Sequence, residues 1–374
     1  MEERDCALWM CSLTALELEE RQKLINFYDN PYEVYLAAGK GKIDESLTLR
    51  VRSILQESVK NFSTEKTLND LHRYNARFIY RKDSDFPEKL LTIPFPPLGL
   101  FVSGNLPDRH MPSVAVIGAR ACSDYGKNAT EFLVSDLAAA GVQIISGLAL
   151  GIDGLSHKVT LKYDGTTFGV LGFGLNKIYP RENAFLFKEI VKKGGIISEY
   201  YLNSYAERKH FPERNRLIAG LADAILVVEA RRKSGTMITV DRALEQGKDV
   251  FVVPGRIGDN LSEGCLELIK QGANLVTSSK DIALFLKDSY PDFVYYDQDD
   301  DCQYSFVDEN NNKKIALENE ELIVYSLLSL KPTHLDMLVI LSKLDYYTVF
   351  ETLQSLRQKG LINETSPEYF VRIK

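Results

Sequence analysis

The middle of the chain, from residue 113 to about residue 276, alternates short apolar runs with longer amphipathic stretches. Runs such as SVAVIG and AILVVEA place Val, Ile, Leu and Ala at consecutive positions. Consecutive apolar positions are typical of strands buried on both faces, and the amphipathic stretches between them supply crossover helices. The pattern therefore predicts an α/β fold with an extended, Rossmann-like, doubly wound parallel sheet.

The two ends of the chain predict smaller units. The stretch PFPPLGLFVSGNLPD cannot continue a helix, and the acidic, Asn-rich stretch DQDDDCQYSFVDENNNKK lacks periodic apolar positions. The last segment has the helices and hairpin, in order, of a winged helix. These breaks predict four ranges: an N-terminal helical domain of the SAM-like type (1–93), the Rossmann-like domain (94–290), an acidic linker (291–316) and a winged-helix domain (317–374).

The composition and net charge do not exclude a nucleic-acid partner. The formal net charge is −7, but nine acidic residues and two lysines between positions 297 and 321 account for all of it. The rest of the chain is neutral overall, and nucleic-acid binding requires only one positive face. The N-terminus lacks a secretory apolar core, and no apolar run approaches the roughly 20 residues of a membrane span. We expect a cytoplasmic protein without membrane contact.

Glycines and basic residues follow the predicted strands. Ligands of doubly wound sheets bind outside the carboxyl ends of the strands, so these loops form the candidate site. Glycines let backbone N–H groups approach a phosphate, and arginines offer forked donors. The candidate residues are Gly118, Arg120, Ser146, Gly147, Lys177, Arg214, Asn215, Arg216, Ser234, Gly235 and Thr236. We expect these loops to bind several phosphates in a row, while the five scattered cysteines predict neither a disulfide framework nor a metal site.

The stretch HFPERNRLIAG carries the strongest signal. We expect a helix to begin after Pro212, which places Arg214 and Arg216 in its first turn. Cations are unfavourable there, because the helix dipole prefers an anion. Together with Arg120, the two arginines are expected to line one pocket for an anionic ligand.

These motifs resemble the bacterial DNA-processing protein A (DprA, or Smf) family. The resemblance rests on VIGAR, SGLALGID, GLNKIYPRENAFL, FPERNRLIAG, VVEARRKSGTMIT and VFVVPG, and it covers most of residues 98–287. It implies a protein that binds single-stranded DNA, forms a homodimer and helps load the RecA recombinase during natural transformation. Such binding would combine phosphate contacts with base stacking, for which Phe211 and Tyr179 are candidates. The same resemblance implies a dimer contact through the segment CLELIKQGANLV, with Leu266, Ile269 and Leu275 as its apolar positions.

Two alternatives stay open at this point. Nucleotide hydrolases of the cytokinin-activating type have a related sheet and a late loop with a catalytic glutamate, but Thr239 occupies that position here, which removes the proton-transfer group. A nucleotide-binding sensor without catalysis is the other alternative, although it accounts for fewer of the arginines. We therefore expect no enzymatic activity, no cofactor and no metal.

Overall fold

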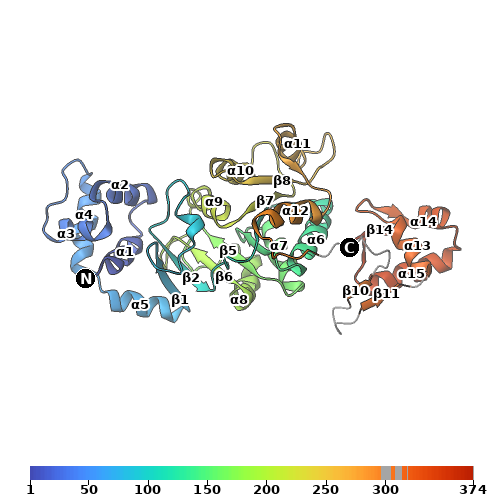
Figure 1. The fold of residues 1–374 in the computed structure, drawn as a ribbon, viewed down its shortest axis with the longest axis horizontal. Coiled ribbons are helices and arrows are strands. Elements are labelled where there is room, and N and C mark those ends of the chain that lie inside the picture. Colours follow the sequence, from blue (N-terminus) through green and yellow to red (C-terminus); the bar gives the residue numbers. More distant parts are fainter. Residues whose placement is uncertain (296–304, 308–313, 318, 374) are drawn as a thin grey trace.

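The computed structural model describes residues 1–295, 305–307, 314–317 and 319–373. Helices of the N-terminal range lie at one end of the molecule, a large sheet with its helices lies in the middle, and the C-terminal unit lies at the other end (Figure 1). The expected acidic linker falls largely outside the described residues.

The N-terminal range is helical up to Arg73. Tightly packed side chains of its first helix, including Leu8, Trp9 and Met10, are completely or almost completely buried in a core of its own. Side chains of the first two strands also join this core, so the helices are packed onto the end of the sheet. The helices are α1 (Glu3–Ser12), α2 (Leu18–Tyr28), α3 (Pro31–Gly39), α4 (Leu49–Asn61) and α5 (Thr64–Arg73).

The central sheet has nine strands in the order β1-β2-β6-β5-β4-β3-β7-β8-β9. Strands from β6 to β9 in this order are parallel, whereas β1 and β2 are antiparallel. The strands are β1 (Ala76–Tyr80), β2 (Gly99–Gly104), β3 (Ser113–Ile117), β4 (Gln143–Ser146), β5 (Thr167–Leu171), β6 (Gly195–Ser198), β7 (Ala224–Val227), β8 (Asp249–Val252) and β9 (Asn274–Leu275). The parallel, doubly wound sheet confirms the predicted fold class. One detail differs: β1, within the range expected to be helical, is an edge strand of this sheet.

Helices cover both faces of the sheet, as the uninterrupted apolar strands require. Along β3, Ala115 and Ile117 face the core beneath α9 and α10, while Val114 and Val116 face the core beneath α6 and α12. The remaining elements of the sheet region are η1 (Glu88–Leu90), α6 (Asp124–Ala139), α7 (Ile152–Lys162), η2 (Arg181–Asn183), α8 (Ala184–Lys193), α9 (His210–Leu221), α10 (Gly235–Glu245), α11 (Glu263–Lys270) and α12 (Ser279–Ser289).

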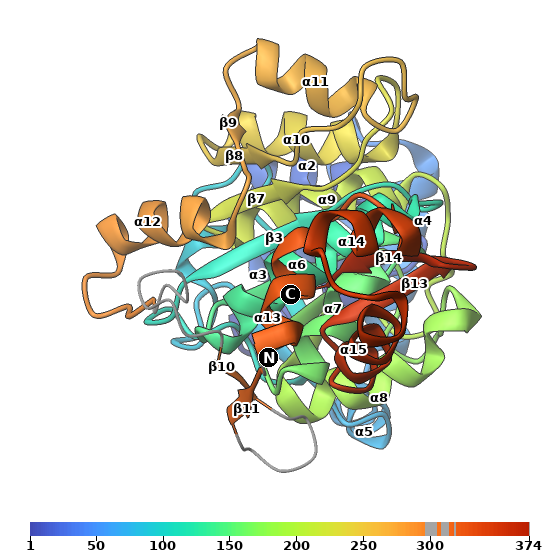
Figure 2. The same cartoon turned by 90° about the vertical axis from the view of Figure 1, so that its right-hand side faces the viewer.

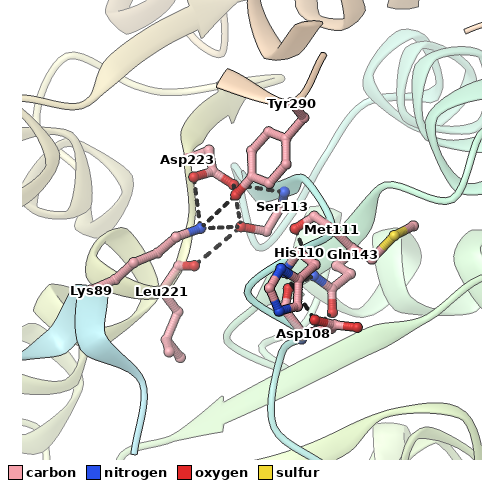
Figure 3. Close-up of polar contacts among 9 residues, drawn as sticks. All are labelled: Lys89, Asp108, His110, Met111, Ser113, Gln143, Leu221, Asp223 and Tyr290. Atoms are coloured by element: carbon pink, nitrogen blue, oxygen red, sulfur yellow. Dashed lines mark hydrogen bonds and ion pairs between the residues drawn. The ribbon is translucent and has the colours of Figure 1, made fainter. Parts of the chain in front are cut away.

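A polar cluster joins four segments at the amino ends of β3 and β7 (Figure 3). The Lys89 ammonium lies 2.6 Å from the Asp223 carboxylate, which also accepts hydrogen bonds from the Ser113 backbone N–H (2.9 Å) and the Tyr290 hydroxyl (3.0 Å). Every one of these groups has its partner within the cluster. The cluster therefore links η1, β3, the start of β7 and the end of α12, at the edge of the sheet opposite the carboxyl-end loops.

The C-terminal unit contains three helices and a small antiparallel sheet with its own buried apolar core. Figure 2 shows its helices and strands gathered in front of the larger body. The elements are α13 (Asn319–Leu327), β12 (Thr333–His334), α14 (Leu335–Ser342), α15 (Tyr346–Gln358), β13 (Ile362–Ser366) and β14 (Tyr369–Arg372), preceded by the short pair β10 (Ser305–Val307) and β11 (Lys314–Ala316). This order is the one expected of a winged helix. Across the described ranges, no helix is long and apolar enough to cross a membrane.

Candidate nucleic-acid interface

β3 and β7 are parallel neighbours at the point where the strand order reverses: β4, β5 and β6 follow on one side of β3, and β7, β8 and β9 lie on the other. Ligand crevices of doubly wound sheets form at such a point. Two contacts fix the loops there: the Glu229 carboxylate accepts hydrogen bonds from the backbone N–H and hydroxyl of Ser123, and the Thr236 hydroxyl donates to the Gly118 carbonyl at 3.1 Å. The predicted loops after β3 and β7 therefore do meet, through Gly118 and Thr236.

Gly151 sets the path of the loop that carries Arg120. Its φ of +77° is in the left-handed region, and a Cβ there would lie 2.2 Å from the Ala119 carbonyl oxygen and 2.5 Å from that of Arg120. The Ile152 N–H also donates to the Ala119 carbonyl at 3.2 Å. Only glycine permits this close approach. The loop is held by its backbone, and the Arg120 side chain is left exposed.

A small pocket lies between Arg120 and two aromatic rings. The Arg120 guanidinium carbon is 5.7 Å from the centre of the Phe211 ring, and the Tyr179 ring centre is 5.9 Å from that of Phe211. Tyr179 is 47% exposed and Leu150 is 40% exposed, so the pocket opens to solvent through apolar and aromatic groups. Its lining consists of Arg120, Gly147, Ala149, Leu150, Tyr179, Pro180 and Phe211.

Arg214 lies beneath this pocket and is buried. Its guanidinium donates to the backbone carbonyls of Gly147 (3.0 Å) and Val170, at the ends of β4 and β5. Burial lowers the pKa of Arg214 to about 10, while the nearby Asp153 carboxylate opposes this shift. A Cβ on Gly147 would lie 2.7 Å from both the Arg214 guanidinium and the Asp153 carboxylate, so glycine is needed for these groups to approach the loop. Arg214 supports the floor of the pocket.

Arg216 does not join Arg120 and Arg214, which corrects the expectation of one shared pocket. Helix α9 begins at His210 instead of after Pro212, so both arginines lie beyond its first turn. Residues two apart on a helix differ in direction by roughly 200°. Arg216 accordingly points the other way, where it forms a buried ion pair with Glu199. Both arginines therefore lie outside the turn in which the helix dipole disfavours a cation.

The remaining candidate residues differ in accessibility. The Ser146 hydroxyl is buried and donates to the Val116 carbonyl at 2.6 Å, and Asn215 is 9% exposed beside Arg214. Lys177 is partly exposed, with its ammonium 4.9 Å from the centre of the exposed Tyr205 ring. Gly235 is exposed at the start of α10, and the Ser234 hydroxyl is buried without a hydrogen-bond partner among the described residues. Among the candidates, Arg120 and Gly235 are exposed, whereas Gly118, Lys177, Phe211 and Ser234 are partly exposed.

Two residues that hold the loops of the site were not predicted from the sequence. The Asn183 amide donates to the carbonyls of Leu148 (3.0 Å) and Ala149 (2.9 Å) and so holds the loop after β4. Asp153 interacts with the backbone N–H groups of Gly147 and Ala149, and burial raises its pKa against the opposing effect of Arg214. Both polar side chains follow predicted strands, but their targets are backbone groups that only the folded loops bring near.

Comparisons with known proteins agree with this geometry. The family model for DNA recombination-mediator protein A matches residues 77–287. Protein Smf of Escherichia coli is 44% identical over 221 residues, which cover 59% of this chain and 59% of that protein. DNA processing protein DprA of Streptococcus pneumoniae is 44% identical over 200 residues, covering 54% of this chain and 71% of that protein.

Two solved structures are also similar. The DNA processing protein A structure from Streptococcus pneumoniae matches with a TM-score of 0.63 and 32% identity, over 74% of this chain and 96% of that one. The protein from Helicobacter pylori, solved for its single-stranded DNA binding mode, matches with a TM-score of 0.51 and 29% identity, over 59% of this chain and 97% of that one. With more than half of its residues matched by the family model, the chain belongs to the DNA recombination-mediator protein A family.

Proposed function

We propose that this chain is a cytoplasmic protein that binds single-stranded DNA along the carboxyl edge of its sheet, largely without regard to base sequence. The observation that carries the proposal is the exposed Arg120 guanidinium lying over Phe211, beside the half-exposed Tyr179 ring. A guanidinium binds phosphate oxygens through forked donors, and aromatic rings stack on unpaired bases of any sequence. The two kinds of group stand side by side here, as a flexible single strand requires.

Further basic groups extend the same edge. Arg231, Arg232 and Lys233 are exposed just before the start of α10, and Thr236 of that helix contacts the loop of Gly118. The N-terminus of α10 offers backbone N–H groups to a phosphate. A strand that runs from Phe211 past Arg120 toward Gly235 would meet cations along its path. The Helicobacter pylori relative, a single-stranded DNA binder, supports this choice of ligand.

The same proposal assigns the chain a role in recombination, in which it loads RecA onto bound single strands during natural transformation. Its membership of a recombination-mediator family supports this role. The measurement is RecA-driven strand exchange on DNA coated with single-strand-binding protein. We expect the chain to raise the rate, and an Arg120→Ala variant to lose most of the effect because it no longer holds the strand. An unchanged rate with the parent chain would contradict the role.

We further propose that binding proceeds without catalysis. Thr239, at the position of the glutamate in the hydrolase loop, is 3% exposed and cannot exchange protons at neutral pH. Incubation with nucleoside monophosphates should therefore release no free base. Asp241 stands two residues after Thr239 on α10 and is the carboxylate nearest to it in the sequence. Turnover that disappears in an Asp241→Asn variant would instead favour the hydrolase alternative.

The direct test is Arg120→Ala, measured by fluorescence anisotropy of a labelled single-stranded oligonucleotide. We expect binding to weaken by about 1–3 kcal/mol, the range for charge-assisted hydrogen bonds. The plot of log affinity against log salt should become shallower by about 0.7 for each phosphate that the variant no longer neutralises. The melting temperature should not change, because the Arg120 side chain is exposed.

Arg73→Ala is the matched control, because that side chain is 76% exposed on α5 and does not belong to the lining of the Arg120 pocket. It should keep the parent affinity and salt slope. If both variants bind like the parent, Arg120 is not part of a DNA site and the proposed edge is wrong.

A further inference from the structure

A second and larger cavity, of about 140 Å³, lies where the N-terminal helices meet the sheet region. Helix α2 contributes Arg21 and Ile25, the segment before β2 contributes Phe95, and α9 and α10 contribute Arg216 and Arg242. Cavities of about 150 Å³ hold a benzene-sized group. The cavity is separate from the pocket of Arg120, since the two share no lining residue.

Two buried arginines among the lining residues have donors without a partner among the described residues. Arg21 is 7% exposed and donates from Nη2 to the Leu13 carbonyl at 2.8 Å, but its Nε and Nη1 have no hydrogen-bond partner among the described residues. Arg216 is 8% exposed, and within the same ranges its Nη1 also lacks a partner. A buried donor without a partner costs about 1–3 kcal/mol, more for a charged group. Such donors point to a group with acceptor oxygens as their missing partner.

Three of the four glutamates that line the cavity are already engaged, and the fourth, Glu19, has an exposed side chain. Glu199 pairs with Arg216, Glu245 lies 2.7 Å from Arg242, and Glu213 accepts the Tyr200 hydroxyl at 2.6 Å. None of these contacts uses the free donors of Arg21. An acceptor from outside the chain is therefore the complement that Arg21 requires.

The charges and the apolar residues of the lining indicate the chemical class of that acceptor. The lining includes four arginines and four glutamates, which balance formally, so a singly charged anion disturbs the balance less than a doubly charged one. The lining also contains the apolar residues Leu18, Ile25, Pro94, Phe95, Pro96 and Leu98. We propose that this cavity binds a small monocarboxylate with an apolar body, its carboxylate on Arg21 and Arg216 and its body against Phe95 and Ile25.

Occupation of the cavity would connect two parts of the fold. Arg21 belongs to the N-terminal helices, whereas Arg216 belongs to α9 of the sheet region. A carboxylate held by both adds contacts between these parts that exist only in the folded chain. Binding therefore raises the stability of the folded chain as the ligand concentration increases.

Benzoate is the probe, with the full chain followed by thermal unfolding and titration calorimetry. We expect benzoate to raise the melting temperature and to bind at one site, while neutral benzamide does neither. Arg21→Gln should weaken benzoate binding by about 10- to 100-fold, the fold-change equivalent to losing a charge-assisted hydrogen bond. Arg73→Gln, at an exposed arginine of α5, should bind benzoate like the parent.

Arg21→Gln also loses the hydrogen bond to the Leu13 carbonyl, so this variant could fail to fold. A second variant therefore tests the same cavity. Phe95 is 61% exposed at the mouth of the cavity, and Phe95→Ala should weaken benzoate binding severalfold in a folded protein. The proposal is overturned if the parent chain does not bind benzoate at millimolar concentration, or if benzamide or inorganic phosphate binds more tightly. It is also overturned if Phe95→Ala and a folded Arg21→Gln variant bind benzoate as the parent does.

Discussion

A buried guanidinium needs hydrogen-bond acceptors in the folded chain, and Arg214 finds its acceptors in the backbone carbonyls of Gly147 and Val170. We expect Arg214→Ala to lower the free energy of unfolding by about 3–5 kcal/mol, because it leaves the Asp153 carboxylate buried without its cation. Urea unfolding followed by circular dichroism measures the change. Arg216→Ala should cost a similar amount, through Glu199.

The matched control is Arg120→Ala, which removes an exposed guanidinium from the same region and should leave the unfolding free energy within about 0.5 kcal/mol of the parent. If the Arg214 variant binds DNA more weakly, its lower stability would show that the loss comes from a disturbed pocket and not from a lost contact with DNA. An Arg214→Ala variant as stable as the parent would contradict the buried hydrogen bonds.

His157 gives the fold a pH dependence. The Thr167 hydroxyl donates to the Ile144 carbonyl at 2.8 Å, so it accepts from the His157 Nδ1–H at 2.6 Å. The Nε2 atom is buried and has no partner among the described residues, and burial lowers the pKa of His157 to about 3, with Arg214 adding to the shift. Protonation would place a charge at Nε2 without an acceptor.

The folded-state pKa lies below the unfolded-state value of about 6.5, so the unfolded chain takes up the proton first as the pH falls. Stability is therefore lost from about pH 6.5 down to about pH 3. Between pH 7 and pH 5 the parent should lose about 2 kcal/mol more than a His157→Gln variant, measured by urea unfolding at both pH values. Equal losses in the two proteins would show that His157 does not titrate in this way.

At the scale of elements, the sequence predicts the strands, but it does not predict where α9 begins or which of its arginines faces the site. Consecutive apolar residues such as those of β3 require burial on both faces, which only a covered parallel sheet supplies. The start of α9 depends instead on the chain before Pro212, where the His210 ring stacks against Tyr200 at 4.2 Å. Any helix that contains both arginines points them about 200° apart, but only the packing of α9 against the sheet decides that Arg214 reaches the carbonyls at the ends of β4 and β5 and that Arg216 reaches Glu199. Such tertiary contacts leave no mark in the local sequence.

The edge strand β9 is the place where we propose that two copies of the chain meet. It pairs with β8 on one side only, and Leu275 is 49% exposed. Leu275→Glu should therefore give a folded monomer in sedimentation, while the parent sediments as a dimer. Ile269 packs against the core of the sheet, so Ile269→Glu should reduce stability as well. A dimer that persists in Leu275→Glu would place the contact elsewhere.

At the scale of the whole molecule, we expect residues 297–314 to separate two independently packed cores. The sheet region and the C-terminal unit each bury their own apolar residues. The acidic composition of the segment between them offers little apolar area to bury, and such segments are preferred sites of proteolysis. Limited trypsin digestion should cut first at Lys313 or Lys314, identified by mass spectrometry of the fragments. First cuts within the sheet region would contradict this division.

The cut chain then tests where the DNA site lies. The pocket and its basic neighbours all fall between Gly118 and Thr236, and every described contact that holds them comes from the sheet region. The large fragment should consequently bind a single-stranded oligonucleotide within about twofold of the full chain, with the same salt slope, because that slope reflects how many phosphates the protein neutralises. If the C-terminal unit also touched the strand, the slope would fall by about 0.7 for each phosphate that this unit neutralises. An unchanged slope would leave the C-terminal unit free to contact a protein partner, a role consistent with its exposed Ile340 and Tyr347.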